Sequence, residues 1–217
     1  MQDIKLTLVG SMDVGKTCML FSYCYGSYPA GYIPEVFDPY SMHMTVDNKA
    51  IKLHLWDTKE WDYDQNKWGE RFRPQLYPGT DVFLVCYSTS SHRSLDQVKK
   101  KWYPEISHFC RGVPFLLIGT KSDISCDELI LERVAENPPE LRDKPLGPEE
   151  GQLVADSLGA TKHMICSALT MEGIKEVFDE AVRTVLYPPQ RQIHKSKIKS
   201  MLCALFSSRA QKDPPQE

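Results

Sequence analysis

Hydrophobic and polar residues follow two different spacings along this chain, one typical of strands and the other typical of helices. Residues 4–9 form an apolar run that contains Lys5 and Thr7. Residues 82–87 and 115–118 are continuous apolar runs, which favour central strands covered on both faces. In residues 51–56 apolar and polar side chains alternate, as they do in a strand whose two faces differ. Residues 164–166 predict a short last strand.

Between these runs, apolar residues recur at the three- and four-residue spacing of a helix face. Two such stripes consist of Leu95, Val98, Trp102 and Ile106, and of Ile174, Val177, Phe178, Ala181, Val182 and Val185. Pro148 opens a further helix, and Gly159 suits its C-terminal cap. This alternation predicts an α/β fold with a mostly parallel, doubly wound sheet of about six strands flanked by helices.

The composition fits one domain that carries a tail. At 217 residues and 41% hydrophobic content, the chain can bury a full core without disulfides or a structural metal. Seven cysteines without a C-x-x-C pair, and histidines without a cluster, argue against a disulfide framework or a zinc site. The net charge of -3 and the pI near 6.1 provide no basic field, so nucleic acid is not an expected partner.

No stretch approaches the roughly 20 apolar residues that span a bilayer, and the N-terminus lacks a basic region followed by an apolar signal core. We therefore expect a cytoplasmic, monomeric protein. Residues 190–217 form a basic tail whose lysines, together with Cys203, suit contact with the cytoplasmic face of the plasma membrane. Residues 203–206 have the form of a prenylation box, but 11 residues follow them. Trimming of the end, S-palmitoylation of Cys203 and a simply solvated tail are the alternatives.

The first apolar run breaks into residues 10–17, Gly-Ser-Met-Asp-Val-Gly-Lys-Thr, which match the phosphate-binding loop G-x-x-x-x-G-K-[ST] and precede helical sequence. Lys16 neutralises phosphate charge, and the Thr17 hydroxyl ligates Mg²⁺. The backbone N–H groups that cup phosphate oxygens include those of Asp13, Val14 and Gly15. The loop therefore predicts binding of a nucleoside diphosphate or triphosphate with Mg²⁺.

Two further motifs follow strands, where ligands bind in an open α/β sheet. Asp57 ends the strand at residues 51–56, and its carboxylate can hold Mg²⁺ opposite Thr17. After the strand at residues 115–118, the Asp123 carboxylate can accept hydrogen bonds from N1–H and the N2 amino group of guanine, which adenine cannot supply. Guanine is therefore the expected base. The other residues expected around it are Thr120, Lys121, Ser167 and Ala168.

The order of these motifs resembles that of a Rho-family small GTPase of the Rac-like branch, over roughly residues 3–189. The resemblance is carried by residues 10–17, 32–34, 36–40, 56–58, 77–84, 101–105, 120–123, 166–169 and 177–181. It implies a small-GTPase domain at residues 1–189, with an insert helix near residues 125–136. It also implies a GTP/GDP-dependent signalling switch for actin and cell-shape pathways, whose switch segments order against the γ-phosphate.

The resemblance also implies roles for single residues. Tyr28 takes the place of an aromatic residue that packs against the guanine ring, and the backbone N–H of Cys18 can reach the α-phosphate. Effector proteins would read the first switch at Val36, Phe37, Asp38 and Tyr40. Exchange factors are further expected partners, and Trp56 resembles a position that governs their choice.

Three departures from the family pattern fall where GTP hydrolysis takes place. Met12 stands where the family has Gly and would crowd the attacking water. Glu35 stands where the family carries a Thr that binds Mg²⁺. Residues 59–62 read Lys-Glu-Trp-Asp in place of Ala-Gly-Gln-Glu, so the water-orienting Gln is missing and Gln65 is the nearby substitute. We therefore expect impaired hydrolysis.

Three functions remain open on this evidence. The first is a switch that holds guanine nucleotide with Mg²⁺ and hydrolyses GTP poorly. The second is a working GTPase in which Gln65 or Glu60 orders the attacking water. The third is a pseudo-GTPase scaffold that binds only GDP, or nothing.

Overall fold

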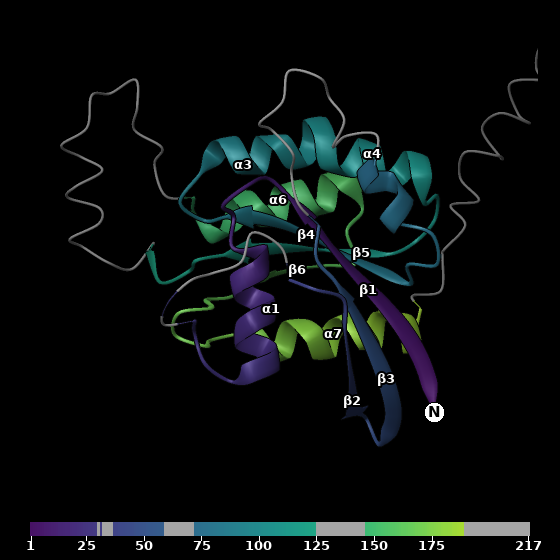
Figure 1. Ribbon diagram of the computed structural model, residues 1–217. Helices are drawn as coiled ribbons and strands as arrows, with labels where there is room; N and C mark the ends of the chain where they lie inside the picture. Colours follow the sequence, from purple (N-terminus) through teal and green to yellow (C-terminus); the bar gives the residue numbers. More distant parts are fainter. Residues whose placement is uncertain (30, 32–36, 59–71, 125–145, 189–217) are drawn as a thin grey trace, which may run out of the picture.

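The structure is a computed structural model that describes residues 1–29, 31, 37–58, 72–124 and 146–188 (Figure 1). The described residues form a six-stranded sheet in the order β2-β3-β1-β4-β5-β6. The strands are β1 (Gln2–Gly10), β2 (Tyr40–Val46), β3 (Lys49–Trp56), β4 (Val82–Ser88), β5 (Phe115–Thr120) and β6 (Lys162–Ile165). Neighbouring strands are parallel except β2 and β3, which are antiparallel. The predicted α/β fold with a mostly parallel sheet is confirmed.

Helices cover both faces of the sheet. In Figure 1, α1 and α7 lie below the sheet and α3, α4 and α6 lie above it. The helices are α1 (Lys16–Tyr25), η1 (Arg73–Leu76), α3 (His92–Gln97), η2 (Val98–Trp102), α4 (Tyr103–Phe109), α6 (Pro148–Leu158) and α7 (Ile174–Leu186). Within these described segments no helix has the length and apolar character needed to cross a membrane.

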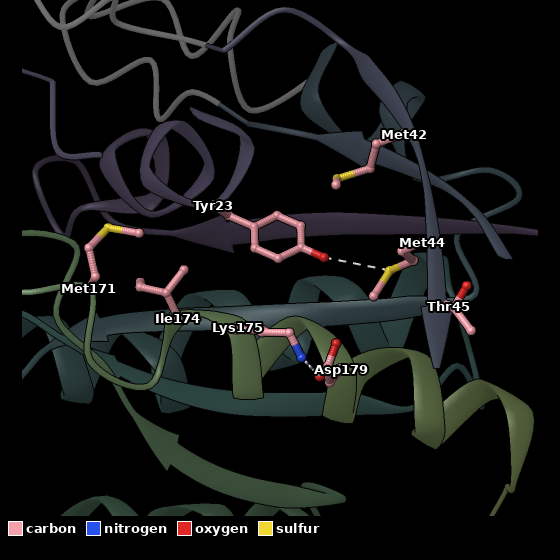
Figure 2. Close-up of a pocket in the computed structure, with 8 residues that line it drawn as sticks. All are labelled: Tyr23, Met42, Met44, Thr45, Met171, Ile174, Lys175 and Asp179. Atoms are coloured by element: carbon pink, nitrogen blue, oxygen red, sulfur yellow. Dashed lines mark hydrogen bonds and ion pairs between the residues drawn. The ribbon is translucent and has the colours of Figure 1, made fainter. Parts of the chain in front are cut away.

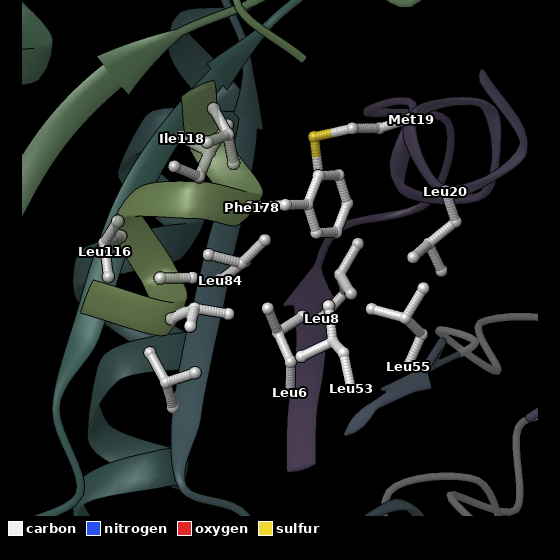
Figure 3. Close-up of a cluster of buried hydrophobic side chains, with 14 of the residues drawn as sticks. Leu6, Leu8, Met19, Leu20, Leu53, Leu55, Leu84, Leu116, Ile118 and Phe178 are labelled. Atoms are coloured by element: carbon white, nitrogen blue, oxygen red, sulfur yellow. The ribbon is translucent and has the colours of Figure 1, made fainter. Parts of the chain in front are cut away.

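Each central strand sends alternate side chains into two separate cores. On β4, Leu84 joins the cluster that packs under α1 and α7, whereas Val85 joins the cluster under α3, α4 and α6. Figure 3 shows the first cluster, in which the ring of Phe178 lies beside Met19 above leucines of the sheet. Each large side chain buried in this way contributes about 1.5–3 kcal/mol. Burial on both faces explains why residues 82–87 of β4 and residues 115–118 of β5 are continuously apolar in sequence.

β2 is an edge strand that the hydrophobic pattern did not predict. It forms a hairpin with β3 through Asp47 and Asn48, whose φ angles are 48° and 63°. Two successive residues with positive φ are typical of a two-residue hairpin turn, and Asp and Asn tolerate that conformation. Apart from Val46, the side chains of β2 are exposed or half-buried, so no apolar run marks the strand. The successive residues Asp47 and Asn48 were the feature of the sequence that indicated a hairpin turn.

The apolar stripe from Leu95 to Ile106 lies along a helical stretch whose middle departs from α-helical geometry. α3 continues into η2, which is π-helical, and η2 continues into α4. The last residue of η2 is Trp102, which is fully buried. Residue spacing alone did not reveal this departure, because a π turn changes the hydrogen-bond pattern over a few residues only.

Two predicted boundaries can be compared with the structure. The predicted short last strand is confirmed, but its bounds of 164–166 are wrong. β6 is Lys162–Ile165, because the polar residues at its start pair with β5 through their backbone. The helix predicted from Pro148 to a cap at Gly159 is confirmed, and Gly159 has the expected left-handed φ of 72°. The insert helix predicted near residues 125–136 lies outside the described residues.

A close approach joins α6 to the sheet at Gly151. The Tyr87 hydroxyl and Nε2 of His163 lie 2.8 Å apart, and a Cβ at Gly151 would overlap both atoms. Burial lowers the pKa of His163, so its ring is neutral at pH 7. Gly inside a helix costs about 1 kcal/mol relative to Ala. The close packing explains why a glycine stands here despite that cost.

We expect Gly151→Ala to lower the free energy of unfolding by about 1 kcal/mol, because overpacking costs about 1–3 kcal/mol and outweighs the gain in helix propensity. Urea unfolding measures the change. The control is Leu153→Ala on the same helix, whose side chain is exposed, with an expected change within about 0.5 kcal/mol. A more stable Gly151→Ala variant would contradict the close approach.

Candidate functional site

The loops that follow β1, β3, β5 and β6 meet at the carboxyl ends of these strands, because the strands are parallel and all end on the same side of the sheet. Motifs from four separate parts of the chain are therefore brought together. The contacts that join them pair Thr17 with Asp57, Thr120 with Val14, and Ser167 with Asp123.

Two glycines shape the loop between β1 and α1. Gly10 has a φ of 151°, and a Cβ there would overlap the carbonyl oxygen of Cys86 on β4. Gly15 is the N-cap of α1, with a φ of 97° that strains any other residue. Asp13 also has a positive φ, of 58°. Turns of this kind form concave backbone surfaces whose N–H groups bind anions.

Lys16, the first residue of α1, lies inside this loop. It is only 6% exposed, and its Nζ donates to the carbonyl oxygens of Gly10 and Ser11, each 2.7 Å away. The ammonium therefore adds its charge at a helix N-terminus, where the helix dipole already favours an anion. This arrangement suits a phosphate group.

The carboxylate of Asp57, directly after β3, organises the opposite side of the loop. Its Oδ2 accepts hydrogen bonds from the Thr17 hydroxyl at 2.6 Å and from the Phe37 N–H at 3.0 Å. Its Oδ1 accepts from the N–H of Thr58 at 3.0 Å. Asp57 is 5% exposed, and burial raises the pKa of its carboxyl, while these hydrogen bonds and the Lys16 charge act in the opposite direction.

A hydroxyl beside a buried carboxylate is a donor set that fits Mg²⁺, which prefers oxygen ligands. A divalent cation held by Thr17 and Asp57 would offset the cost of burying the carboxylate charge. Mg²⁺ keeps several waters and takes substrate phosphates, so one or two protein ligands are enough. Among the residues that the structure describes, no group of three or more His, Cys, Asp or Glu side chains could hold a metal ion.

Thr120 fastens the loop to the end of β5. Its hydroxyl lies within hydrogen-bonding range of the Val14 carbonyl and, at 2.9 Å, of the Tyr87 carbonyl. Lys121 follows with a positive φ of 59°. Its side chain passes beside the loop, since a Cβ built at Gly15 would lie 3.7 Å from Lys121 Cε. The aliphatic part of Lys121 is thus placed along the site.

Asp123 and Ser167 form the part of the site that was predicted to recognise the base. The Ser167 hydroxyl donates to Oδ1 of Asp123 at 2.5 Å and accepts from the Thr170 N–H at 3.1 Å. The hydroxyl of Ser22, from α1, donates to the Ala168 carbonyl at 3.0 Å. The loop after β6 is therefore tied to α1 and to the loop after β5, so the Asp123 carboxylate is oriented by the protein itself.

Tyr28 and Cys18 lie together at this site. Burial raises the pKa of the Tyr28 hydroxyl, and the neighbouring Cys18 and the charge of Asp123 raise it further. Burial raises the pKa of the Cys18 thiol, so the sulfur is protonated at neutral pH. The role predicted for Cys18 uses its backbone N–H, which the protonated thiol leaves unaffected.

The residues predicted to bind effectors differ in exposure. Phe37 is 8% exposed, and its ring contacts that of Phe21 on α1, with centroids 6.5 Å apart. In this arrangement Phe37 anchors its segment in the core and does not present its ring at the surface, contrary to the expectation for an effector contact. Asp38 and Tyr40 are exposed.

Some residues predicted for hydrolysis, effector binding and membrane attachment lie outside the described part of the structure. Met12 is described and is 46% exposed in the loop. Those outside the described residues are Glu35, Val36, residues 59–62, Gln65 and Cys203.

Two polar contacts of the site were missed by sequence reasoning. Thr58 donates from its hydroxyl to the Leu8 carbonyl at 2.7 Å and so ties the end of β3 to β1. Ser22 is a buried polar residue on a helix face that otherwise packs in the core. A serine in an apolar stripe is a visible signal that it has a partner, but its spacing does not reveal that the partner is the carbonyl of Ala168.

A separate cavity of about 360 Å³ lies between α1, β2 and α7 (Figure 2). The Tyr23 hydroxyl points toward the Met44 sulfur, 3.5 Å away, and Lys175 pairs with Asp179 at 2.7 Å. The complete lining is Tyr23, Met42, Met44, Thr45, Met171, Ile174, Lys175 and Asp179. None of the predicted nucleotide-binding residues lines this cavity, so it is distinct from the loop site.

The chain matches a known protein family over most of its length. The family model described as Ras family matches residues 5–187 of the 217. The match begins within β1 and ends just after α7, so it includes all of the described sheet except the first three residues of β1, and every site residue placed above.

We expect Thr120→Val to lower the free energy of unfolding by about 1–2 kcal/mol, because the carbonyl groups that its hydroxyl serves are buried and would lose a donor. The matched control is Thr184→Val on α7, which is also buried but donates only within its own helix, to Glu180 at 3.0 Å. Urea unfolding compares the two variants. Equal losses would show that the contact of Thr120 with the loop adds no stability.

Proposed function

Because the chain belongs to the Ras family of small GTPases, we propose that it is a Rho-like signalling switch, nearest the Rac-like branch, that holds guanine nucleotide and hydrolyses GTP slowly. Membership of the family supports the binding of guanine nucleotide, Mg²⁺ and effector proteins. One observation carries the proposal for this chain: Thr17 pairs with Asp57, and Ser167 pairs with Asp123, both at the carboxyl ends of the parallel strands.

The loop and its lysine are suited to the phosphates. Lys16 and the N-terminus of α1 supply positive charge, and Thr17 and Asp57 would hold Mg²⁺. When bound, the metal ion supplies further charge that stabilises phosphate oxygens. These residues bind and orient the phosphates without taking part in bond cleavage.

Recognition of guanine would rest on Asp123. A carboxylate only accepts hydrogen bonds, and guanine presents two donors along one edge, at N1 and at the N2 amino group. Adenine presents an acceptor at N1 and no amino group at C2, so it would offer the carboxylate neither of these two donors. The hydrogen bond from Ser167 supports this proposal because it limits the rotation of the Asp123 carboxylate.

Slow hydrolysis is supported by the residue types around the γ-phosphate position. Met12 brings a long side chain into a loop position where the related pattern has glycine, and residues 59–62 lack the water-orienting Gln. Glu35 adds a negative charge that phosphate would repel. Together, the Gln and an arginine finger account for about 10⁵-fold in stimulated turnover. The residues for binding are retained and those for cleavage are replaced, so we propose that binding is the function.

The surface around the first switch is the proposed effector site. Asp38 and Tyr40 are exposed next to the anchored Phe37, so they are available to a partner. By resemblance to Rho-family proteins, we propose that the pathway concerns actin and cell shape. The basic residues 190–217 and Cys203 support a location in the cytoplasm with attachment to the inner face of the plasma membrane.

We expect Asp123→Asn to weaken GDP binding at least about 100-fold, because two hydrogen bonds to a charged acceptor are lost at about 1.5–3 kcal/mol each. The same variant should gain affinity for xanthosine diphosphate, whose C2 carbonyl can accept from the Asn amide. Isothermal titration with GDP, ADP and xanthosine diphosphate measures both effects.

Asp96→Asn is the control for this substitution. Asp96 lies on α3 and pairs with Lys99 at 2.8 Å on the protein surface, so its change should leave nucleotide affinity unaltered. An unmodified chain that binds ADP as tightly as GDP would overturn the guanine assignment.

Single-turnover hydrolysis of preloaded GTP should be slower than the intrinsic rate of a Ras-type GTPase, which is about 3–5 × 10⁻⁴ s⁻¹. Met12→Gly should remain slow, because relieving the crowding does not restore the missing Gln. Chromatography of the nucleotide after denaturation, at a series of times, measures the rate.

The same experiment separates the other two functions. Brisk turnover that is lost in Gln65→Ala or Glu60→Ala would identify a working GTPase. An unmodified chain that retains only GDP, or no nucleotide, even after loading would identify a scaffold. A stable GTP complex is the outcome expected for the proposed switch.

A further inference from the structure

The side chain of Trp102 reaches the nucleotide loop from the opposite face of the sheet. Its indole Nε1 donates to the hydroxyl oxygen of Ser11 at 3.1 Å, across 91 positions of sequence. Trp102 is fully buried and belongs to the core beneath α3, α4 and α6. A buried indole N–H needs an acceptor, and here that acceptor is a residue of the phosphate-binding loop.

The local backbone decides where this indole points. Trp102 is the last residue of η2, the π-helical segment between α3 and α4. A π turn rotates the residues that follow it relative to a continuous α-helix, and such turns occur frequently at functional sites. The departure from α geometry therefore coincides with the residue that contacts the loop.

A cluster of Arg73, Glu105 and Tyr77 packs against the indole ring. The Arg73 guanidinium lies 4.6 Å from the centroid of the Trp102 ring. Arg73 donates twice to Glu105, at 2.9 and 2.6 Å, and the Tyr77 hydroxyl donates to the same carboxylate at 2.5 Å. Because Arg73 and Tyr77 are almost completely buried, this cluster restricts the position of the ring.

Ser11 has a second role in the loop through its backbone. Its carbonyl oxygen accepts from Lys16 Nζ at 2.7 Å, beside the Gly10 carbonyl. The side chain of Ser11 is thus held by Trp102 while its carbonyl group holds the lysine that faces the phosphates. A loop fixed in this way loses less conformational entropy when a ligand binds.

We infer that Trp102 and Ser11 are positioning residues for the nucleotide loop: their hydrogen bond keeps the loop and Lys16 in the arrangement that retains bound nucleotide. This inference rests on the proposed function, because it concerns the same site. It adds a determinant of nucleotide release that lies outside the phosphate-binding residues and on the opposite face of the sheet.

The test is the dissociation rate of a fluorescent GDP from the full chain, at fixed Mg²⁺ and with excess unlabelled GDP. Ser11→Ala removes the acceptor and Trp102→Phe removes the donor. Each should release GDP about three- to tenfold faster, which is the range that one net hydrogen bond contributes. The double variant should be no faster than the single variants, because both remove the same contact.

Ser107→Ala is the matched control. Ser107 lies on α4 and donates only to the Tyr103 carbonyl at 2.6 Å, so it loses a hydrogen bond without touching the loop. Its GDP dissociation rate should equal that of the unmodified chain. Thermal unfolding of all variants is measured in parallel, because a merely structural contact would lower Tm without changing the rate.

The outcomes separate this inference from the proposed function. If the unmodified chain bound no guanine nucleotide, both would fall. If it bound GDP and Ser11→Ala released it at the unmodified rate, only the positioning role would fall. If Trp102→Phe does not fold, the GDP release rate of Ser11→Ala alone tests the positioning role, because this substitution removes only a hydroxyl group. If the fold-increases of the two single variants multiplied in the double variant, the two residues would act independently, and this would also overturn the inference.

Discussion

Three hydrogen bonds converge on the buried carboxylate of Asp57, and the arrangement of the site depends on them. They come from the hydroxyl of Thr17 on α1, the N–H of Phe37 ahead of β2, and the N–H of Thr58 after β3. An ionised carboxylate with so little contact with water is costly unless its oxygen atoms are hydrogen-bonded. The charge of Asp57 therefore favours keeping three separate segments of the chain together, and Mg²⁺ would share the same oxygen atoms.

The sheet provides the rigid frame on which this interaction is built. β1, β4 and β5 contribute side chains to the cores on both faces of the sheet, so their carboxyl ends are held by two cores and not by the loops themselves. Thr120 and Thr58 then attach the loops to the strand ends through single hydroxyl groups. The site thus combines apolar packing, which gives stability without direction, with a few buried hydrogen bonds, which give direction.

Central and edge strands differ in how well their sequences predicted them. β4 and β5 have apolar residues on both faces, and a run such as residues 82–87 has few other structural interpretations. β2 and β6 lie at the edges, where polar side chains face the solvent and the backbone pairing on one side is enough to form the strand. Edge strands therefore leave a weak hydrophobic pattern, and β2 was missed while β6 was placed two residues late.

The sequence by itself determined the residue types of the candidate site and their order. A turn that requires glycine, a lysine at a helix start and acidic residues after strands are local requirements of the backbone and of the charge. Only the tertiary structure decided that Phe37 is buried, that Ser22 donates to Ala168, and that Trp102 reaches Ser11. These contacts join segments far apart in the chain, and their geometry depends on how whole helices pack against the sheet, which no local spacing of residues specifies.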